Sequence, residues 1–395
     1  MDFHYRWEWQ LRSTPEQLWP YVSDTQHFNR VAVGYTVQTI AEDDEGVQQV
    51  RAHYLAPLAW DEYPFEWERP YRFGVVRRFH GPILRDFIVN TTLVPHTTGT
   101  LLRYEVTART ATLLGILAIP VQIGLISRRR FERAFRRIDE FLQHPIGSRT
   151  PFAAPRPFIT GEAAQRLQDI ARTLAEDGYP ADLIKQLIDL ISQADDEEVA
   201  HLRPYALADR WGAPRRDVLE LCLAATRHSL LDLRWNVVCP MCRGAKTAVP
   251  QLSDIHDRAH CPACRADFDV NFDHTLEVTF RPNAALRRVE LVEYCVGGPQ
   301  LTPHIVAQQI MAPGETRTIK VVLDNGAHRV RTRANLPRAL EGHLDLRVTS
   351  DPDEQPASAI TVQATAEGWS SDRNVVTSAA AITLSNHTSA PQGIV

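Results

Sequence analysis

Two matched cysteine pairs constrain the fold of this chain more than any other feature of its sequence. Four of the six cysteines lie in the patterns C-P-M-C and C-P-A-C, and they are Cys239, Cys242, Cys261 and Cys264. A C-x2-C turn directs two sulfurs toward one point, and two such turns complete the tetrahedral thiolate set of structural zinc. The proline inside each pair favours the required tight turn. The pattern therefore predicts one structural Zn2+ held by these four cysteines, with no open catalytic position.

Two other uses of these cysteines stay open. Two disulfides would need an oxidising compartment, and the lack of a signal peptide at the start of the chain favours a reducing, cytoplasmic location instead. A redox dithiol needs only one pair. His256 and His260 are near enough to replace a ligand, but we interpret them as solvated loop residues. Cys222 and Cys295 lie in apolar stretches and are expected to be buried free thiols.

The N-terminal part has the element order of a sheet closed by one long helix. Ser13-Thr14-Pro15-Glu16 predicts a helix start after a first strand. Several strand-like runs follow, and a long helix is expected from Pro120 to about Gln143. Its apolar stripe consists of Ile126, Phe131, Phe135, Ile138 and Leu142. This order, with the stretch T-P-E-Q-L-W-P-Y-V-S-D-T-Q-H-F-N, resembles the START-like helix-grip superfamily over residues 1–145.

That resemblance implies a curved sheet around the long helix, with a cavity for a small apolar ligand. Candidate lining residues in the aromatic-rich strands are His53, Trp67, His80 and Tyr104. The sequence does not assign these side chains to a face of the sheet. The alternative is a cavity filled by side chains, which would make the domain a docking module.

An apolar stretch precedes the long helix. Residues 111–127 contain only Thr112, Gln122 and Ser127 as polar residues, and three arginines follow. The run is short for a membrane span and is interrupted by Pro120 and Gly124, so no span is predicted. We expect a buried loop leading into the first turns of the helix. The alternative is peripheral membrane contact through the arginines.

The middle of the chain is predicted to be helical. Residues 146–160 read as a proline-rich linker, and 161–235 as helices ending in a helix-turn-helix-strand order that looks like a winged helix. Arg215, Arg216, Arg227 and His228 are candidate DNA contacts. Asp217 and Glu220 share their helix and no basic stripe continues beyond it, which favours protein packing instead.

The C-terminal part is predicted to be all β. From residue 276 on, turn signals such as Pro313-Gly314 and Asn325-Gly326 separate strand-like runs, which indicates an antiparallel β-sandwich. The chain stops inside a strand-like stretch, as expected for part of a longer protein. The predicted fold is therefore multi-domain α+β, with a helix-grip domain (1–145), a linker (146–160), a winged-helix-like domain (161–235), a zinc ribbon (236–275) and a β-sandwich-like domain (276–395).

Composition and motifs limit the function. The net charge of −5 argues against general nucleic-acid binding, and 44% hydrophobic with 23% charged residues is typical of a soluble protein. No phosphate-binding loop, dinucleotide fingerprint, H-E-x-x-H or G-x-S-x-G motif occurs. We therefore predict that this chain is not itself an enzyme.

The middle third carries a more specific resemblance. The stretches L-R-P-Y-A-L-A-D-R-W-G, W-N-V-V-C-P-M-C-R-G-A-K and H-C-P-A-C-R-A-D-F-D-V are similar to the N-terminal region of bacterial class III adenylate/guanylate cyclases. The resemblance implies zinc ligation by the four cysteines and a cyclase domain in cis, which this chain lacks. It implies a regulatory region that senses a ligand or partner and controls cyclic-nucleotide synthesis, with homodimerisation left open. The alternative is a zinc-ribbon, winged-helix regulator that binds DNA.

Overall fold

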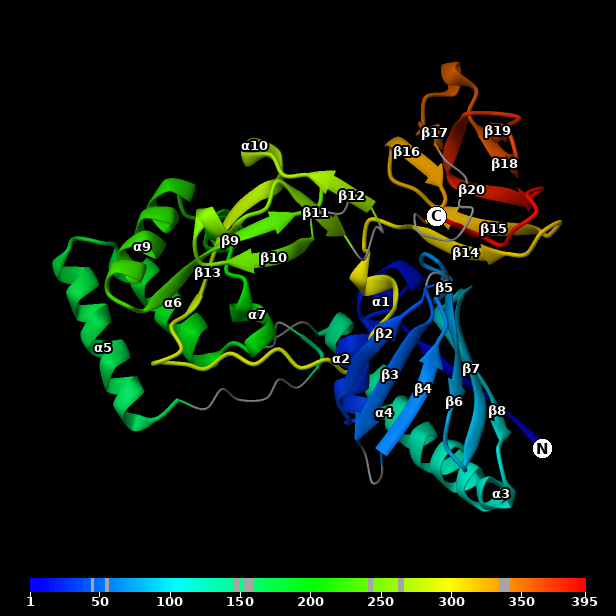
Figure 1. The fold of residues 1–395 in the computed structure, drawn as a ribbon, viewed down its shortest axis with the longest axis horizontal. Helices are drawn as coiled ribbons and strands as arrows, with labels where there is room; N and C mark the ends of the chain where they lie inside the picture. Colours follow the sequence, from blue (N-terminus) through cyan, green and yellow to red (C-terminus); the bar gives the residue numbers. More distant parts are fainter. Residues whose placement is uncertain are drawn as a thin grey trace. The chain divides into compact units, whose positions relative to one another are not determined.

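The chain forms two compact units that do not follow sequence order. The computed structural model describes residues 1–43, 46–53, 57–144, 150–152, 159–240, 244–261, 266–333 and 342–395. One unit combines Met1–Phe152 with Glu293–Val395, and the other combines Ala153–Pro262 with Ala266–Val292. Figure 1 shows the elements of both units.

The N-terminal part of the first unit is an antiparallel sheet with one long helix packed against it; it resembles a helix-grip fold, and we call it the helix-grip domain. Its strands are β1 (Asp2–Leu11), β2 (Val37–Glu42), β3 (Gln48–His53), β4 (Pro57–Glu62), β5 (Glu66–Glu68), β6 (Arg72–Phe79), β7 (Leu84–His96) and β8 (Gly99–Thr110). They form an antiparallel sheet in the order β1-β8-β7-β6-β4-β3-β2, with β5 beside β6. Helices α1 (Pro15–Val22) and α2 (Thr25–Ala32) connect β1 to β2. A capping box between Thr14 and Gln17 fixes the start of α1, as the sequence predicts.

The long helix begins earlier than predicted. It runs through α3 (Leu113–Ile119), a π-helical segment η1 (Pro120–Ser127) and α4 (Arg128–Gln143). The expectation of a buried loop before Pro120 is therefore wrong, because this stretch is helical and its outer side is exposed. The wider π turn accommodates the proline, which lacks an N–H group, so the helix continues through it. Phe131, Phe135 and Ile138 of α4 are buried against the sheet, which confirms that part of the predicted stripe.

The C-terminal part of the first unit is all β. Its strands are β14 (Ala307–Met311), β15 (Thr316–Val322), β16 (Gly326–Arg331), β17 (His343–Val348), β18 (Ala357–Thr365), β19 (Gly368–Ser371), β20 (Val375–Asn386) and β21 (Gln392–Ile394), with single turns η3 (Pro299–Leu301) and η4 (Pro352–Glu354). Six of these strands form one sheet around β20. The prediction of a purely antiparallel domain is wrong, because β20 pairs in parallel with both β17 and β18. Turn signals identify hairpins, whereas these pairings join strands that are not hairpin neighbours.

The second unit joins helices to small sheets. Its elements are α5 (Gly161–Glu176), α6 (Ala181–Gln193), α7 (Asp196–Ala200), α8 (Pro204–Trp211), α9 (Arg215–Arg227), β9 (Leu231–Val238), β10 (Ala245–Val249), η2 (Leu252–Asp254), β11 (Arg258–Cys261), β12 (Ala266–Asp269), α10 (Phe272–Thr275) and β13 (Leu276–Pro282). The sheet order is β10-β9-β13, and β11 pairs with β12. The strand expected to open the C-terminal sandwich, β13, pairs instead with β9. Phe280 explains this, because it is fully buried among the apolar residues of the helices.

Candidate functional site

Aromatic side chains fill the space between β1, β8 and the long helix. Phe135 of α4 lies 5.2 Å from Trp9 and 4.9 Å from Phe28, measured between ring centroids. Phe131 lies 5.1 Å from Tyr104 and 6.2 Å from Trp7. Such pairs pack at the separations that aromatic rings prefer. This part of the interior is therefore occupied by side chains.

Three of the four predicted ligand-lining residues have described side chains, and His80 lies apart from the other two. Trp67 and Tyr104 belong to the core, and the Trp67 Nε1 donates to the carbonyl oxygen of Ile305 at 3.0 Å. His80 lies on the outer face, where its Nε2 is 2.9 Å from Asp61 Oδ2. The side chain of His53 lies outside the described residues. Side chains alternate along a strand, so His80, which directly follows β6, shares the outer face with the even-numbered residues of β6.

The outer face beside His80 carries a ladder of opposite charges. The ladder is one row across five neighbouring strands, in which each residue lies directly opposite the next: Asp61, Arg78, Asp86, Arg109 and Asp2. Arg109 bonds to Asp2 at 3.0 Å and to Asp86 at 3.0 Å. The hydrogen bond from Arg109 lowers the pKa of Asp2. An open cleft of about 420 Å³ lies over this ladder. The arginines and aspartates that line it are paired, so their opposite charges largely cancel.

The inner face of the sheet carries a buried ion pair that sequence reasoning missed. Arg77 Nε lies 2.7 Å from Glu62 Oε2, and the Glu62 side chain is 3% exposed. Trp60 Nε1 donates to the same oxygen at 3.0 Å. Burial alone lowers the pKa of Arg77, but the charge and hydrogen bond of Glu62 outweigh it, so the net pKa lies above its usual value. The signal in the sequence was the alternation Phe73, Val75, Arg77, in which the arginine takes an apolar position.

A segment from the C-terminal half of the chain packs against this domain beside the ion pair. We call residues 293–305 the strap. The backbone N–H groups of Tyr294 and Cys295 donate to Gln26 Oε1 at 2.8 and 3.1 Å. Thr25 Oγ1 donates to the Gly297 carbonyl at 2.9 Å. Cys295 is 6% exposed, and burial raises the pKa of its thiol to about 11.

Gly297 of the strap lies where no side chain fits. A Cβ at this position would lie 2.8 Å from the Phe65 ring and 3.4 Å from Glu62 Oε1. Real side chains do not approach ring carbons this closely, so the strap passes over the buried carboxylate by its backbone. The strap thus completes the wall of the helix-grip interior in the region of Glu62.

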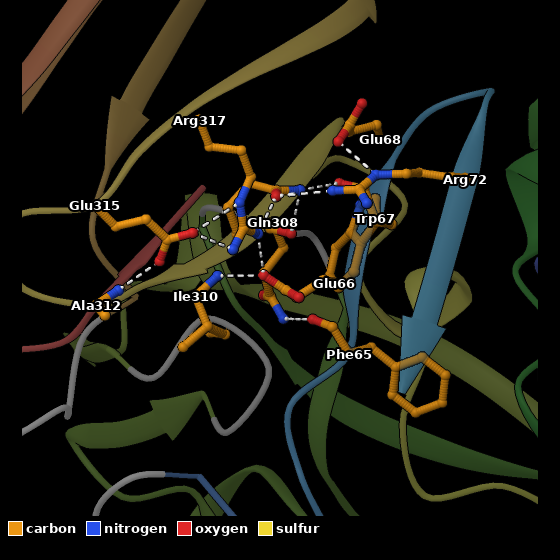
Figure 2. A network of polar contacts seen from close by, with 11 residues as sticks. Phe65, Glu66, Trp67, Glu68, Arg72, Gln308, Ile310, Ala312, Glu315 and Arg317 are labelled. Carbon is orange, nitrogen blue, oxygen red and sulfur yellow. Dashed lines mark hydrogen bonds and ion pairs between the residues drawn. The ribbon is translucent and has the colours of Figure 1, made fainter. Parts of the chain in front are cut away.

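Beyond the strap, β14 joins the helix-grip sheet to the C-terminal strands. It pairs with β5, placing Gln308 opposite Trp67, and on its other side it pairs with β21, placing Gln309 opposite Ile394. Gln308 Nε2 donates to the carbonyl oxygen of Phe65 at 2.6 Å. We call β5, β14 and β21, together with the polar side chains between them, the joint. Figure 2 shows polar contacts of the joint from close by, among them the one between Gln308 and Phe65.

Arg317 is the centre of the joint. Its Nη1 donates to Glu66 Oε1 at 2.6 Å and to Gln309 Oε1 at 2.7 Å. Its Nη2 donates to Glu315 Oε1 at 2.5 Å. Burial lowers the pKa of Arg317, but the two carboxylates outweigh burial and raise the net pKa. Gln309 is fully buried, so these polar groups depend on one another for hydrogen bonds, and the joint has one preferred geometry.

Two of the four predicted zinc ligands lie in the described residues. Cys239 follows β9, and its N–H donates to the Gly244 carbonyl at 3.1 Å, closing the turn into β10. Cys261 ends β11, in register with Ala266 of β12. Both side chains are fully buried thiols, whereas Cys242 and Cys264 lie outside the described residues. The two described thiols thus lie at the ends of two paired strands, β9 and β11.

The two histidines near the cysteine pairs, His256 and His260, are both exposed. His260 Nδ1 lies 2.8 Å from Asp267 Oδ1 on the neighbouring strand. His256 is exposed in the loop before β11. His260 therefore differs from the prediction only in lying on a strand rather than in a loop.

The candidate DNA contacts on α9 and after it are largely engaged with carboxylates. Arg215 bonds to Asp209 at 3.0 Å, and Arg216 bonds to Glu220 at 2.7 Å. His228 Nε2 lies 2.8 Å from Asp177 Oδ2. These pairs reduce the positive charge that phosphate contact requires.

Comparisons with known proteins concern separate parts of the chain. A family of unknown function (DUF5939) matches residues 162–294, about a third of the chain. No curated protein matches. Among solved structures, the ZhuI aromatase/cyclase from Streptomyces sp. R1128 is 12% identical, covering 38% of this chain and 98% of its own, with a TM-score of 0.29. The protein TTHA0849 from Thermus thermophilus is 12% identical over 36% and 99%, with a TM-score of 0.28, and CV1439 from Chromobacterium violaceum is 17% identical over 35% and 96%, with a TM-score of 0.26.

Proposed function

We propose that residues 1–395 form the non-catalytic regulatory region of a class III nucleotide cyclase. The proposal takes its effector domain from the sequence resemblance. The observation that carries it is the position of β21, which pairs with β14, the strand that also pairs with β5 of the helix-grip domain. A catalytic domain attached after Val395 would leave directly from the joint. A change in the helix-grip domain would therefore reach such a domain through a short, hydrogen-bonded path.

The packing of the helix-grip interior bears on the signal that this region senses. Aromatic rings occupy the space beside the long helix, and the strap covers the buried Glu62. Because these side chains fill the space between the sheet and the long helix, they leave less room for a small apolar ligand. A protein or surface partner is therefore the favoured signal, and a small ligand would have to displace the strap.

In the second unit we propose one structural zinc held by Cys239, Cys242, Cys261 and Cys264. When bound, Zn2+ would fasten the two hairpin turns to each other. The strand order also supports a winged helix with this ribbon as an enlarged wing, because Leu202 bridges to Phe280 of β13, and β13 pairs with β9 after the α8–α9 pair. The carboxylate pairs of α9 favour protein packing over DNA binding, and duplex binding that weakens with salt would reverse that preference.

The proposal predicts that this chain alone forms no cAMP or cGMP from ATP or GTP. In a longer protein that carries the cyclase domain, Arg317→Met should change the basal cyclase rate, because it removes the central donor of the joint. Coupling of about 1–3 kcal/mol corresponds to about 5–150-fold. Arg329→Met is the matched control, because Arg329 pairs with Asp345 on an exposed strand of the same domain. Cyclic-nucleotide formation by residues 1–395, or equal rates for both variants and wild type, would contradict the proposal.

A further inference from the structure

The outer side of the helix at 113–127 carries a row of exposed apolar side chains. The exposed members are Leu113 (80%), Leu114 (66%), Leu117 (78%), Val121 (56%) and Leu125 (48%). The opposite side, with Gly115 and Ile119, is buried against the domain. No charged residue occurs between 113 and 127. A helix that is apolar all round is normally covered on every side, and within the described residues this one is covered on one side only.

The turn before β7 extends this apolar surface. Ile83 is 45% exposed, and the turn is held against the start of the helix by a 2.6 Å hydrogen bond from Thr112 Oγ1 to the Pro82 carbonyl. Figure 1 shows α3 at the end of the long helix, beside the ends of β6, β7 and β8. We call Ile83 and the five exposed residues of 113–125 the apolar edge.

Positive charge follows the apolar edge directly. Residues 111–138 contain six arginines and one acidic residue, Glu132, although the whole chain has a net charge of −5. Glu132 pairs with Arg136 at 2.9 Å. Arg128 and Arg129 are exposed, and neither makes an ion pair with another described residue. The charge of the first turn of α4 is therefore available to an anionic partner.

We propose that the apolar edge and Arg128–Arg129 bind the surface of an anionic membrane. None of the helices in the described ranges has the length and apolar character needed to cross a bilayer. Fifteen helical residues span about 22 Å, and an interfacial helix of this kind lies in the plane of the membrane with its apolar side in the acyl boundary. The arginines at its end would then contact the anionic headgroups.

The arrangement favours a lipid surface over a protein partner. A protein interface usually combines an apolar centre with a polar rim that fixes its register. Here the row is an exposed helix edge with no charged residue along fifteen positions. The positive charge of Arg128 and Arg129 lies at the C-terminal end of this row. If the leucines enter the acyl boundary, these arginines are placed at the level of the lipid headgroups.

Flotation of the full chain with vesicles tests this proposal. We expect binding to vesicles of phosphatidylcholine with 30% phosphatidylglycerol, weak binding to pure phosphatidylcholine, and loss of binding at high salt. Leu117→Asp should lower the partition coefficient at least about tenfold, since a charge replaces an inserted apolar group. Arg128→Gln and Arg129→Gln should each lower it about fivefold, equivalent to about 1 kcal/mol per arginine.

Matched variants separate insertion from general effects of charge. Leu252→Asp changes an exposed leucine of the other unit, and Arg166→Gln removes an exposed arginine of α5; both should bind as wild type does. Because Leu117 is exposed, its variant should keep the wild-type Tm. Absence of vesicle binding, or equal binding by Leu117→Asp, would overturn the proposal. Self-association of the wild type that Leu117→Asp abolishes, without vesicle binding, would assign the edge to a second copy of the chain instead.

Discussion

Cys261→Ser is expected to purify with almost no zinc, whereas the wild type carries about one zinc per chain. The variant keeps three of the four thiolates of the proposed tetrahedral site, and metal binding contributes about 10–16 kcal/mol to folding in zinc-finger peptides. Loss of one ligand should therefore unfold the hairpins β9–β10 and β11–β12. The measurement is metal analysis of protein purified without added zinc, combined with limited proteolysis between residues 239 and 269.

The matched control for this variant is Cys222→Ala. Cys222 is buried in α9, away from the two turns, and burial raises the pKa of its thiol to about 12. Its removal should leave the zinc content unchanged. Wild-type protein that contains no metal, with all six thiols open to titration, would rule out the zinc site.

Arg77→Met is expected to destabilise the first unit by about 3–5 kcal/mol, because it leaves the Glu62 carboxylate buried without its counter-ion. Glu62 retains the Trp60 N–H as a donor, but its second oxygen, Oε1, is buried with no hydrogen-bond partner among the described residues. Urea unfolding followed by tryptophan fluorescence reports this change directly, since Trp60 contacts the pair.

Two further variants identify the cause. Arg77→Met combined with Glu62→Gln removes both charges and should recover at least half of the lost stability, because buried pairs are often replaceable together. Arg136→Met breaks an exposed pair with Glu132 and should cost less than about 1 kcal/mol. A loss below about 1 kcal/mol for Arg77→Met would show that water reaches Glu62 and that the strap does not seal it.

The features that sequence reasoning predicted correctly depend on residues close together in the chain. The cap at Thr14 and the apolar spacing of Phe131, Phe135 and Ile138 follow from local hydrogen bonding and helical periodicity. The run of strands between the first helix and the long helix followed from strand-like stretches separated by turns. The π-helical segment was missed because Pro120 reads as a helix start, whereas here the helix widens and continues.

The joint and the strap were beyond sequence reasoning because they depend on distant pairings. Trp67 meets Gln308, and Thr25 meets Cys295, across more than 200 residues. Nothing in the local pattern of β14 selects β5 as its partner. His80 lies outside for a different reason: alternation along the strand places Arg77 inside and His80 outside, and a single-residue shift in register would exchange the faces.

The strap gives the order of synthesis a role in folding. Cys295 and Ile305 belong to the same apolar core as Trp7 and Phe135, so the ribosome must add some 160 residues after the long helix, which ends at Gln143, before that core is complete. At 5–20 residues per second this takes on the order of 10 s. During that interval, residues 153–292 emerge and can fold while the N-terminal sheet still lacks the segment that covers Glu62. The first unit thus starts to fold before the second unit and is completed after it. A nascent chain that stalls before the strap is synthesised would expose an incomplete core to chaperones.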